Sequence, residues 1–306
     1  MWHKVIIPLA LSCVFLASCS EPESLAPPPI IYQCAALTLS ATPTESGLRV
    51  ELLNQSYDLL PTVAASGARY RDNDFAVEFW SKGNEATLTV DGEAYPLCIE
   101  EGTLPSVFSA RGNEPFWLVN IAGTELTLRE PGTEQTTEVQ ARLLLEEEPM
   151  LTWLIETQAG LNLKLLAQYC QDSMSGQSYP YTAYLERDGE HVMGCAGDPR
   201  QLLEGVTWQR AQIAAEKTPT IRFIPESNVV GFAGCNQYRG TYQLSGEGLK
   251  FNPLAATKML CDASAMAIED EWFRQLTKVQ SFRLDAVGEL ELVLNDASVI
   301  QLQRQK

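Results

Sequence analysis

The sequence predicts a mainly β protein with three small antiparallel β-barrel or β-sheet domains, of which the last is an α+β domain with one amphipathic helix. Its 306 residues suffice for two or three domains. Short runs of β-forming residues recur after residue 30, and turn sequences such as Asp91-Gly92 and Ser245-Gly246 separate them. This pattern is typical of compact antiparallel domains. The clearest strand candidates are residues 48–52, 75–79, 86–90, 124–128, 221–224 and 290–294.

One helix is predicted near the C-terminus, over residues 264–279. Apolar residues recur there at helical spacing and form one face: Ala265, Ile268, Trp272, Leu276 and Val279. Either Asp262 or Ser264 is suited to cap its start. We expect the apolar face to pack onto a sheet.

The composition excludes a general nucleic-acid-binding protein. The chain has 22 Lys and Arg against 39 Asp and Glu, a formal net charge of −17. Phosphate contacts need clustered basic residues, so a chain this acidic is expected to attract a basic partner instead. Of its two histidines, His3 falls in the segment that we expect to be removed, and one histidine cannot form a three-histidine zinc site. We therefore predict a binding protein without catalytic residues, cofactor or metal. An enzyme centred on His191 is the alternative.

Residues 1–18 have the features of a secretory signal peptide. One lysine precedes an apolar run that is too short to span a bilayer. The run ends in Leu16-Ala17-Ser18-Cys19, which resembles the bacterial lipobox, where cleavage precedes a cysteine that is then acylated. We expect a lipid anchor at Cys19 and a proline-rich tether over residues 19–31. Ser20 resembles the residue that directs such proteins to the outer membrane, so we expect an anchor in that membrane, facing the periplasm.

The cysteine count fits an exported protein. Once Cys13 leaves with the signal peptide and Cys19 is acylated, six cysteines remain, and a periplasmic disulfide framework requires an even number. They cluster into three separated pairs, which predicts the disulfides Cys34–Cys98, Cys170–Cys195 and Cys235–Cys261. An alternative leaves Cys235 and Cys261 as reduced thiols in a core.

Residues 32–99 contain two tight turns. Ser66-Gly67 follows one β run, and Lys82-Gly83-Asn84 follows the aromatic pair Phe79-Trp80. Taken alone, two hairpin tips indicate a structural role and no function. The stretch resembles the MliC family of membrane-bound inhibitors of c-type lysozyme, which has a YxC start, an SGxxY motif, a WxKG segment and a terminal cysteine. The resemblance implies a small antiparallel β barrel with Cys34–Cys98 as the family disulfide.

The MliC resemblance also implies a binding site. In that family the serine of SGxxY and the lysine of WxKG reach into the lysozyme cleft, and these residues correspond to Ser66 and Lys82. Gly67 and Tyr70 complete the first motif, and Arg69, in its variable slot, is a candidate contact at the rim. The implied partner is a c-type lysozyme, a basic protein that an acidic chain would attract.

The middle segment, residues 106–203, is predicted to be a β domain of unidentified purpose. It contains a GNEPFW sequence at residues 112–117 and a Cys-x-Asp-x-Met-Ser pattern at residues 170–175. It resembles an uncharacterised domain of bacterial envelope lipoproteins. A catalytic interpretation would use four polar residues: Glu114, Asp172, Ser173 and His191. Against it, Ser173 lies in no GxSxG motif.

Residues 204–306 resemble the META domain. Its GxxGCNxxxGxY pattern occurs at residues 231–242, and its TxMxC pattern at residues 257–261. The resemblance implies no catalytic residue, and we interpret Asn236 as a residue that stabilises a turn. The sequence identifies no partner for residues 106–306.

Together these features predict a lipid-anchored periplasmic lipoprotein that inhibits c-type lysozyme by inserting the Ser66 and Lys82 loops into its active-site cleft. The alternative is an envelope-stress or scaffold lipoprotein whose MliC-like and META domains bind partners without inhibiting.

Overall fold

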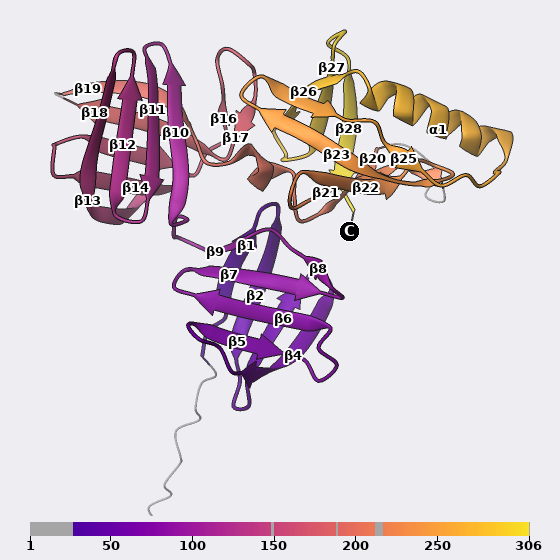
Figure 1. Cartoon of the computed structure of the whole chain (residues 1–306), viewed down its shortest axis with the longest axis horizontal. Helices are drawn as coiled ribbons and strands as arrows, with labels where there is room; N and C mark the ends of the chain where they lie inside the picture. The colour runs from indigo at the N-terminus through magenta and orange to yellow at the C-terminus, as the bar shows by residue number, and fades with distance from the viewer. Residues whose placement is uncertain (1–26, 148–149, 188, 212–216, 306) are drawn as a thin grey trace, which may run out of the picture.

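The computed structural model describes residues 27–147, 150–187, 189–211 and 217–305. Within these ranges it is mainly β with a single α-helix, which confirms the predicted fold class. Figure 1 shows a barrel at the bottom, a second barrel at the upper left and a sheet with the helix at the upper right. We call them the first barrel, the middle barrel and the C-terminal sheet. The predicted signal peptide, Cys19 and most of the predicted tether lie outside the described residues.

The first barrel is an antiparallel sheet in the order β6-β5-β4-β3-β2-β1-β9-β7-β8. It closes because β6 also pairs with β7. Cys34 and Cys98 lie opposite each other on β1 and β9 and form a disulfide. Its strands are β1 (Ile30–Cys34), β2 (Leu37–Pro43), β3 (Leu48–Leu52), β4 (Gln55–Thr62), β5 (Ala68–Arg71), β6 (Val77–Lys82), β7 (Glu85–Val90), β8 (Glu93–Ala94) and β9 (Cys98–Glu100).

The strand predicted over residues 75–79 is wrong at its start. Phe75 has a φ of 58° and is 70% exposed, so it belongs to the turn before β6. A bulky residue in this left-handed region cannot continue a strand. The strand therefore begins at Val77 and extends to Lys82.

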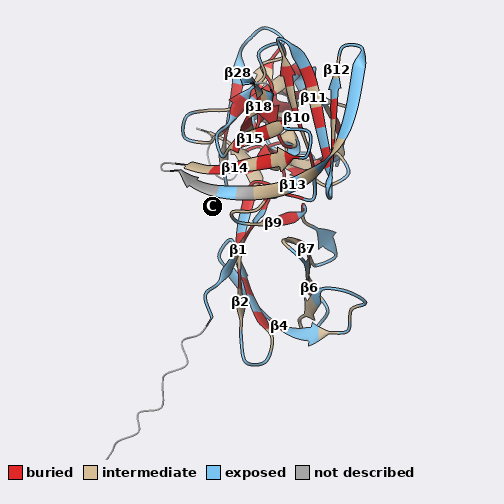
Figure 2. Cartoon of the chain, turned by 90° about the vertical axis from the view of Figure 1, so that its left-hand side faces the viewer, coloured by how far each residue is buried: buried red, intermediate tan, exposed pale blue. Residues whose placement is uncertain are grey.

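The middle barrel is closed in the order β10-β11-β12-β13-β14-β15-β18-β19. Along β11, buried residues alternate with more exposed ones, as a strand with one face toward a core requires (Figure 2). A small hairpin, β16–β17, is tied to β19 by the Cys170–Cys195 disulfide. The strands are β10 (Val107–Asn113), β11 (Phe116–Ala122), β12 (Glu125–Glu130), β13 (Thr133–Glu147), β14 (Met150–Thr157), β15 (Asn162–Leu166), β16 (Cys170–Gln171), β17 (Ser178–Tyr179), β18 (Tyr181–Arg187) and β19 (Glu190–Ala196).

The C-terminal sheet has the order β24-β23-β22-β21-β20-β28-β27-β26, and β25 pairs with β23. A 3₁₀ helix, Pro199–Leu202, leads into it from the middle barrel. The strands are β20 (Thr207–Arg210), β21 (Thr220–Ile224), β22 (Asn228–Phe232), β23 (Gln237–Ser245), β24 (Gly248–Phe251), β25 (Ala255–Ala256), β26 (Val279–Leu284), β27 (Leu290–Leu294) and β28 (Val299–Arg304).

The helix α1 (Ala263–Leu276) is shorter than the predicted range of 264–279 at its C-terminal end. Asp262 is its N-cap, because its carboxylate accepts hydrogen bonds from the backbone N–H groups of Ser264 and Ala265. Val279 fits the apolar spacing of the helix but starts β26 instead. Trp272 and Leu276 are buried, as the predicted apolar face requires.

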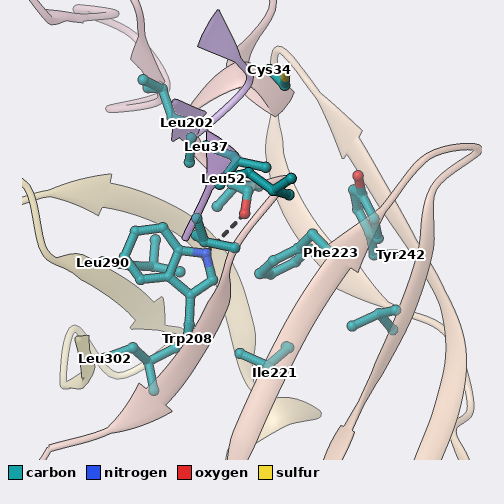
Figure 3. Close-up of a cluster of buried hydrophobic side chains, with 14 of the residues drawn as sticks. Cys34, Leu37, Leu52, Leu202, Trp208, Ile221, Phe223, Tyr242, Leu290 and Leu302 are labelled. Carbon is teal, nitrogen blue, oxygen red and sulfur yellow. Dashed lines mark hydrogen bonds between the residues drawn. The ribbon is translucent and has the colours of Figure 1, made fainter. Parts of the chain in front are cut away.

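The first barrel and the C-terminal sheet share one core, although the middle barrel separates them in the sequence. Cys34 and Leu37 of the first barrel lie in the same buried cluster as Leu202 and Trp208 (Figure 3). The backbone N–H of Ala36 donates a hydrogen bond of 2.9 Å to the carbonyl oxygen of Glu204. Burial of this shared apolar surface favours one fixed arrangement of the two units.

Glu204 at this junction is expected to make the stability of the fold depend on pH. Burial raises the pKa of Glu204 above its ordinary value, although the hydrogen bond from the Tyr242 hydroxyl (2.7 Å) and the charge of Arg200 oppose the shift. The folded state then binds this proton more tightly than the unfolded state, so stability falls as the pH rises through the raised pKa. Glutamine keeps an acceptor for Tyr242 but cannot ionise.

We therefore expect Glu204→Gln to gain stability relative to the wild type as the pH rises from about 4.5 to about 8. Urea denaturation of both proteins across this range measures the difference. A difference that is constant with pH would contradict this prediction.

Candidate functional site

Two turns at one end of the first barrel form the candidate site. The first joins β4 to β5 and contains Ser66 and Gly67. The second joins β6 to β7 and follows Lys82, the last residue of β6. Because β5 and β6 are antiparallel, with Ala68 opposite Ser81, the start of β5 lies beside the end of β6. The fold thus places the two predicted loops next to each other.

Gly67 brings the two turns into direct contact. Its φ is +70°, and a Cβ on this residue would lie 2.2 Å from the carbonyl oxygen of Ser81 and 3.2 Å from the Cβ of Lys82. Only glycine tolerates both the conformation and the close approach. On the other side of the turn, the indole Nε1–H of Trp80 donates a 2.8 Å hydrogen bond to the carbonyl oxygen of Ser66. Ser66 and Lys82 therefore belong to one exposed surface.

Lys82 places a positive charge at this surface. Its neighbour across the turn, Glu85, directs its carboxylate to the backbone N–H of Ser106 at 2.7 Å. Within the described ranges, Lys82 forms no ion pair. An exposed ammonium without an internal partner is available to a carboxylate on another molecule.

Arg69 and Tyr70 lie on strand β5 rather than at the tips of the two turns. The Arg69 guanidinium lies 2.8 Å from a carboxylate oxygen of Glu78 and 5.7 Å from the ring centre of Trp80. Burial alone would raise the pKa of Glu78, but its hydrogen bonds to Arg69 and Arg71 outweigh burial and lower it. Tyr70 packs against the core. Both residues are thus suited to support the turns, and whether they contact a partner remains a prediction.

Asn236 of the C-terminal sheet is the centre of a buried hydrogen-bond network. Its side-chain Oδ1 accepts from the Thr257 hydroxyl (2.8 Å) and the Met259 N–H (2.7 Å). Its Nδ2 donates to Glu269 Oε1 at 3.2 Å, and its backbone N–H donates to Glu269 Oε2 at 2.7 Å. The network joins the GCN turn, the TxMxC segment and α1, beside the Cys235–Cys261 disulfide. It fits the predicted role in stabilising a turn.

Two segments of the chain match known protein families. Residues 32–96 match the family of the membrane-bound lysozyme-inhibitor of c-type lysozyme, MliC. The chain contains an MliC domain. Residues 201–306 match the META domain, so the predicted MliC and META resemblances are confirmed. The MliC match indicates a lysozyme-inhibitor family and an association with the cell envelope.

Similarity to individual proteins adds little to the MliC and META matches. An NMR structure of a protein from Burkholderia xenovorans is 26% identical, over 35% of this chain and 86% of that chain, with a TM-score of 0.30. Crystal structures of BBS1N in complex with ARL6DN, soaked with mercury and with lead, are each 8% identical over 92% of this chain and 93% of that chain, with TM-scores of 0.18 and 0.19. TM-scores this low establish no shared fold. No curated protein matches the chain.

Gly67→Ala is expected to damage the site of the MliC domain. The added methyl group meets the Ser81 carbonyl oxygen and forces a left-handed φ on a non-glycine residue, which together cost about 2 kcal/mol or more. Gly92→Ala in the same domain is the matched control, because Gly92 has a φ of +79° but nothing within 4 Å of its Cβ position. Thermal denaturation and lysozyme inhibition measure both variants. Equal losses in the two variants would contradict the contact argument.

The middle barrel brings its two sequence motifs together away from the MliC turns. The Nδ2 group of Asn113 donates to a carboxylate oxygen of Asp172 at 2.8 Å and lies 3.3 Å from the Ser173 hydroxyl. Burial alone would raise the pKa of Asp172, but hydrogen bonds from Ser175 and Asn113 outweigh burial and lower it. The GNEPFW and Cys-x-Asp-x-Met-Ser patterns therefore form one loop-to-loop contact.

His191 lies on the exposed side of β19, where its Nδ1 is 3.1 Å from Glu186 Oε1. In the ranges that the structure covers, no three His, Cys, Asp or Glu side chains are grouped as metal ligands. No helix among the described residues is long and apolar enough to cross a membrane.

Sequence reasoning missed two residues that hold the Lys82 turn. Asn84 and Glu85 both bond to the segment that joins the first barrel to the middle barrel. The turn sequence Lys82-Gly83-Asn84 marked the position of Asn84, but nothing in the sequence showed which segment it contacts.

Proposed function

We propose that this chain is a lipid-anchored periplasmic inhibitor of c-type lysozyme that inserts its Ser66 and Lys82 turns into the active-site cleft. The observation that carries the proposal is the close contact at Gly67, which joins the Ser66 and Lys82 turns into one exposed surface. This surface lies in a domain that matches the MliC family. Both turns project from paired strands, so a partner can meet them together. On this proposal the chain is an inhibitor and not an enzyme.

The chemistry of a c-type lysozyme explains how Lys82 would inhibit it. The enzyme uses one protonated carboxyl group as a general acid and one ionised carboxylate. An ammonium group placed between them favours ionisation of the acid, which then has no proton for the glycosidic oxygen. The Ser66 hydroxyl can donate to a carboxylate or take the place of a bound water.

Charge supports the encounter between the two proteins. The chain has a formal net charge of −17, and a c-type lysozyme is basic. Opposite net charges accelerate association, and salt screens the effect. Lys82 would then be a local positive group that the acidic remainder of the chain brings to a basic enzyme.

Anchoring and domain division belong to the same proposal. Cleavage after residue 18 would leave Cys19 to carry the acyl chains, with residues 19–31 as the tether to an outer-membrane anchor that faces the periplasm. The inhibitor domain would be residues 32–99, followed by a β domain over 106–203 and the META domain over 204–306. Labelling with a fatty-acid analogue tests the anchor: wild type should incorporate it and Cys19→Ser should not.

A turbidity assay tests the inhibitory function directly. The purified chain without its signal peptide is mixed with a c-type lysozyme and a suspension of cell walls, and lysis should slow in proportion to the inhibitor added. Lysis at an unchanged rate would instead support the alternative, a scaffold or envelope-stress lipoprotein whose MliC domain does not inhibit.

A further inference from the structure

The turn that carries Lys82 is bonded to the connection between the first and middle barrels. The Nδ2 group of Asn84 donates to the Thr103 hydroxyl at 2.9 Å and to the Leu104 carbonyl oxygen at 2.8 Å. The Asn84 carbonyl oxygen accepts from the Glu100 N–H at 2.8 Å. The next residue, Glu85, accepts from the N–H of Ser106. Both residues after Gly83 are therefore fixed to residues 100–106.

This connection is in turn fixed to the middle barrel. Leu104 is 5% exposed and lies in the core cluster of that barrel. The indole Nε1–H of Trp153, on β14, donates to the Gly102 carbonyl oxygen at 3.0 Å. Arg142, on β13, reaches the Pro105 carbonyl oxygen at 3.5 Å. A connection held by a buried side chain and by hydrogen bonds from two strands is not a free linker.

We propose that the middle barrel holds the Lys82 turn in position. Asn84 and Trp153 are the positioning residues, because they bond to the connection between the two barrels from its two sides. The inference rests on the proposed inhibitory function. Lys82 is two residues from Asn84, so the bonds that Trp153 and Leu104 hold on the connection also hold the backbone from which the Lys82 side chain projects. An inhibitor whose binding groups are already held in place loses less conformational entropy on binding.

Two variants of the full chain test this coupling from opposite ends. Asn84→Ala removes both side-chain hydrogen bonds at the turn. Trp153→Phe removes the indole donor in the middle barrel but keeps an aromatic ring, at a residue 71 positions along the sequence from Lys82. Trp117→Phe is the matched control, because Trp117 is buried in the same barrel and its Nε1 has no hydrogen-bond partner among the described residues.

The readouts are the inhibition constant against a c-type lysozyme and hydrogen exchange of the segment 82–86 without lysozyme. We expect Asn84→Ala to raise the inhibition constant about tenfold and Trp153→Phe about threefold, and both to speed exchange in that segment. Trp117→Phe should leave exchange there and the inhibition constant unchanged. Unchanged exchange and inhibition in both Asn84→Ala and Trp153→Phe would overturn the positioning role.

Failure of the proposed function is distinguishable from failure of this inference. If the wild type does not slow lysis, the inhibitory function is wrong, yet the exchange experiment still reports whether the middle barrel holds the turn. If the wild type inhibits and Trp153→Phe behaves like Trp117→Phe in both measurements, the positioning role alone is wrong.

Discussion

Lys82→Ala is expected to weaken inhibition of c-type lysozyme by about 2–5 kcal/mol, which is roughly 30-fold or more in the inhibition constant. The loss is large because the ammonium group has no internal partner in the described part of the chain and would be desolvated between two carboxyl groups of the enzyme. Removing it restores the general acid of the lysozyme to its protonated form.

The measurement is the inhibition constant from lysis rates at several inhibitor concentrations. Lys250→Ala is the matched control, since Lys250 is an exposed lysine on β24 of the C-terminal sheet. It changes the net charge by the same amount and should leave the constant almost unchanged. If Lys82→Ala inhibited as well as Lys250→Ala, Lys82 would not be the inhibitory residue.

Asn236→Ala is expected to lower the free energy of unfolding of the C-terminal sheet by about 3 kcal/mol. Asn236 is 2% exposed, and its truncation removes the side-chain hydrogen bonds to Glu269 Oε1, the Thr257 hydroxyl and the Met259 N–H. Glu269 is 8% exposed and, among the described residues, keeps only the bond from the backbone N–H of residue 236. A buried polar group that loses its partner cannot recover the bond from water, so the loss exceeds that of a surface hydrogen bond.

Urea denaturation followed by tryptophan fluorescence measures this loss. Asn228→Ala is the control in the same sheet, because Asn228 is half-buried and its Nδ2 makes longer contacts, at 3.2 Å and 3.5 Å, with the carbonyl oxygens of Pro225 and Glu226. Its cost should stay below about 1 kcal/mol. Equal destabilisation by both variants would argue that the network around Asn236 contributes no more than a surface turn.

Local patterns in the sequence predict much of this fold because they depend on neighbouring residues. Residues 48–52 alternate apolar and polar side chains, and residues 290–294 do so except at Val293; both are strands with those bounds. The helix was predicted to end too late, because Val279 continues the apolar spacing although the chain has already left the helix at Thr277. Glu269 gave no signal of burial, since a carboxylate on a helix normally faces water.

The candidate site depends on register, which the sequence does not state. The motifs identify Ser66 and Lys82 as residues, but their proximity depends on the pairing of Ala68 with Ser81. The contact from Asn84 to Leu104 spans twenty residues and joins a turn to a connection between barrels. Such contacts follow from how separate sheets pack and leave no periodic trace in the chain.

The shared core of the first barrel and the C-terminal sheet has a consequence for biosynthesis. Leu37 leaves the ribosome long before Leu203 and Trp208, yet these residues end in one buried cluster. Until the last third of the chain has folded, the first barrel presents an uncovered apolar patch around Leu37. We expect a holding chaperone to be needed during that interval, and truncated products that end before residue 202 to aggregate.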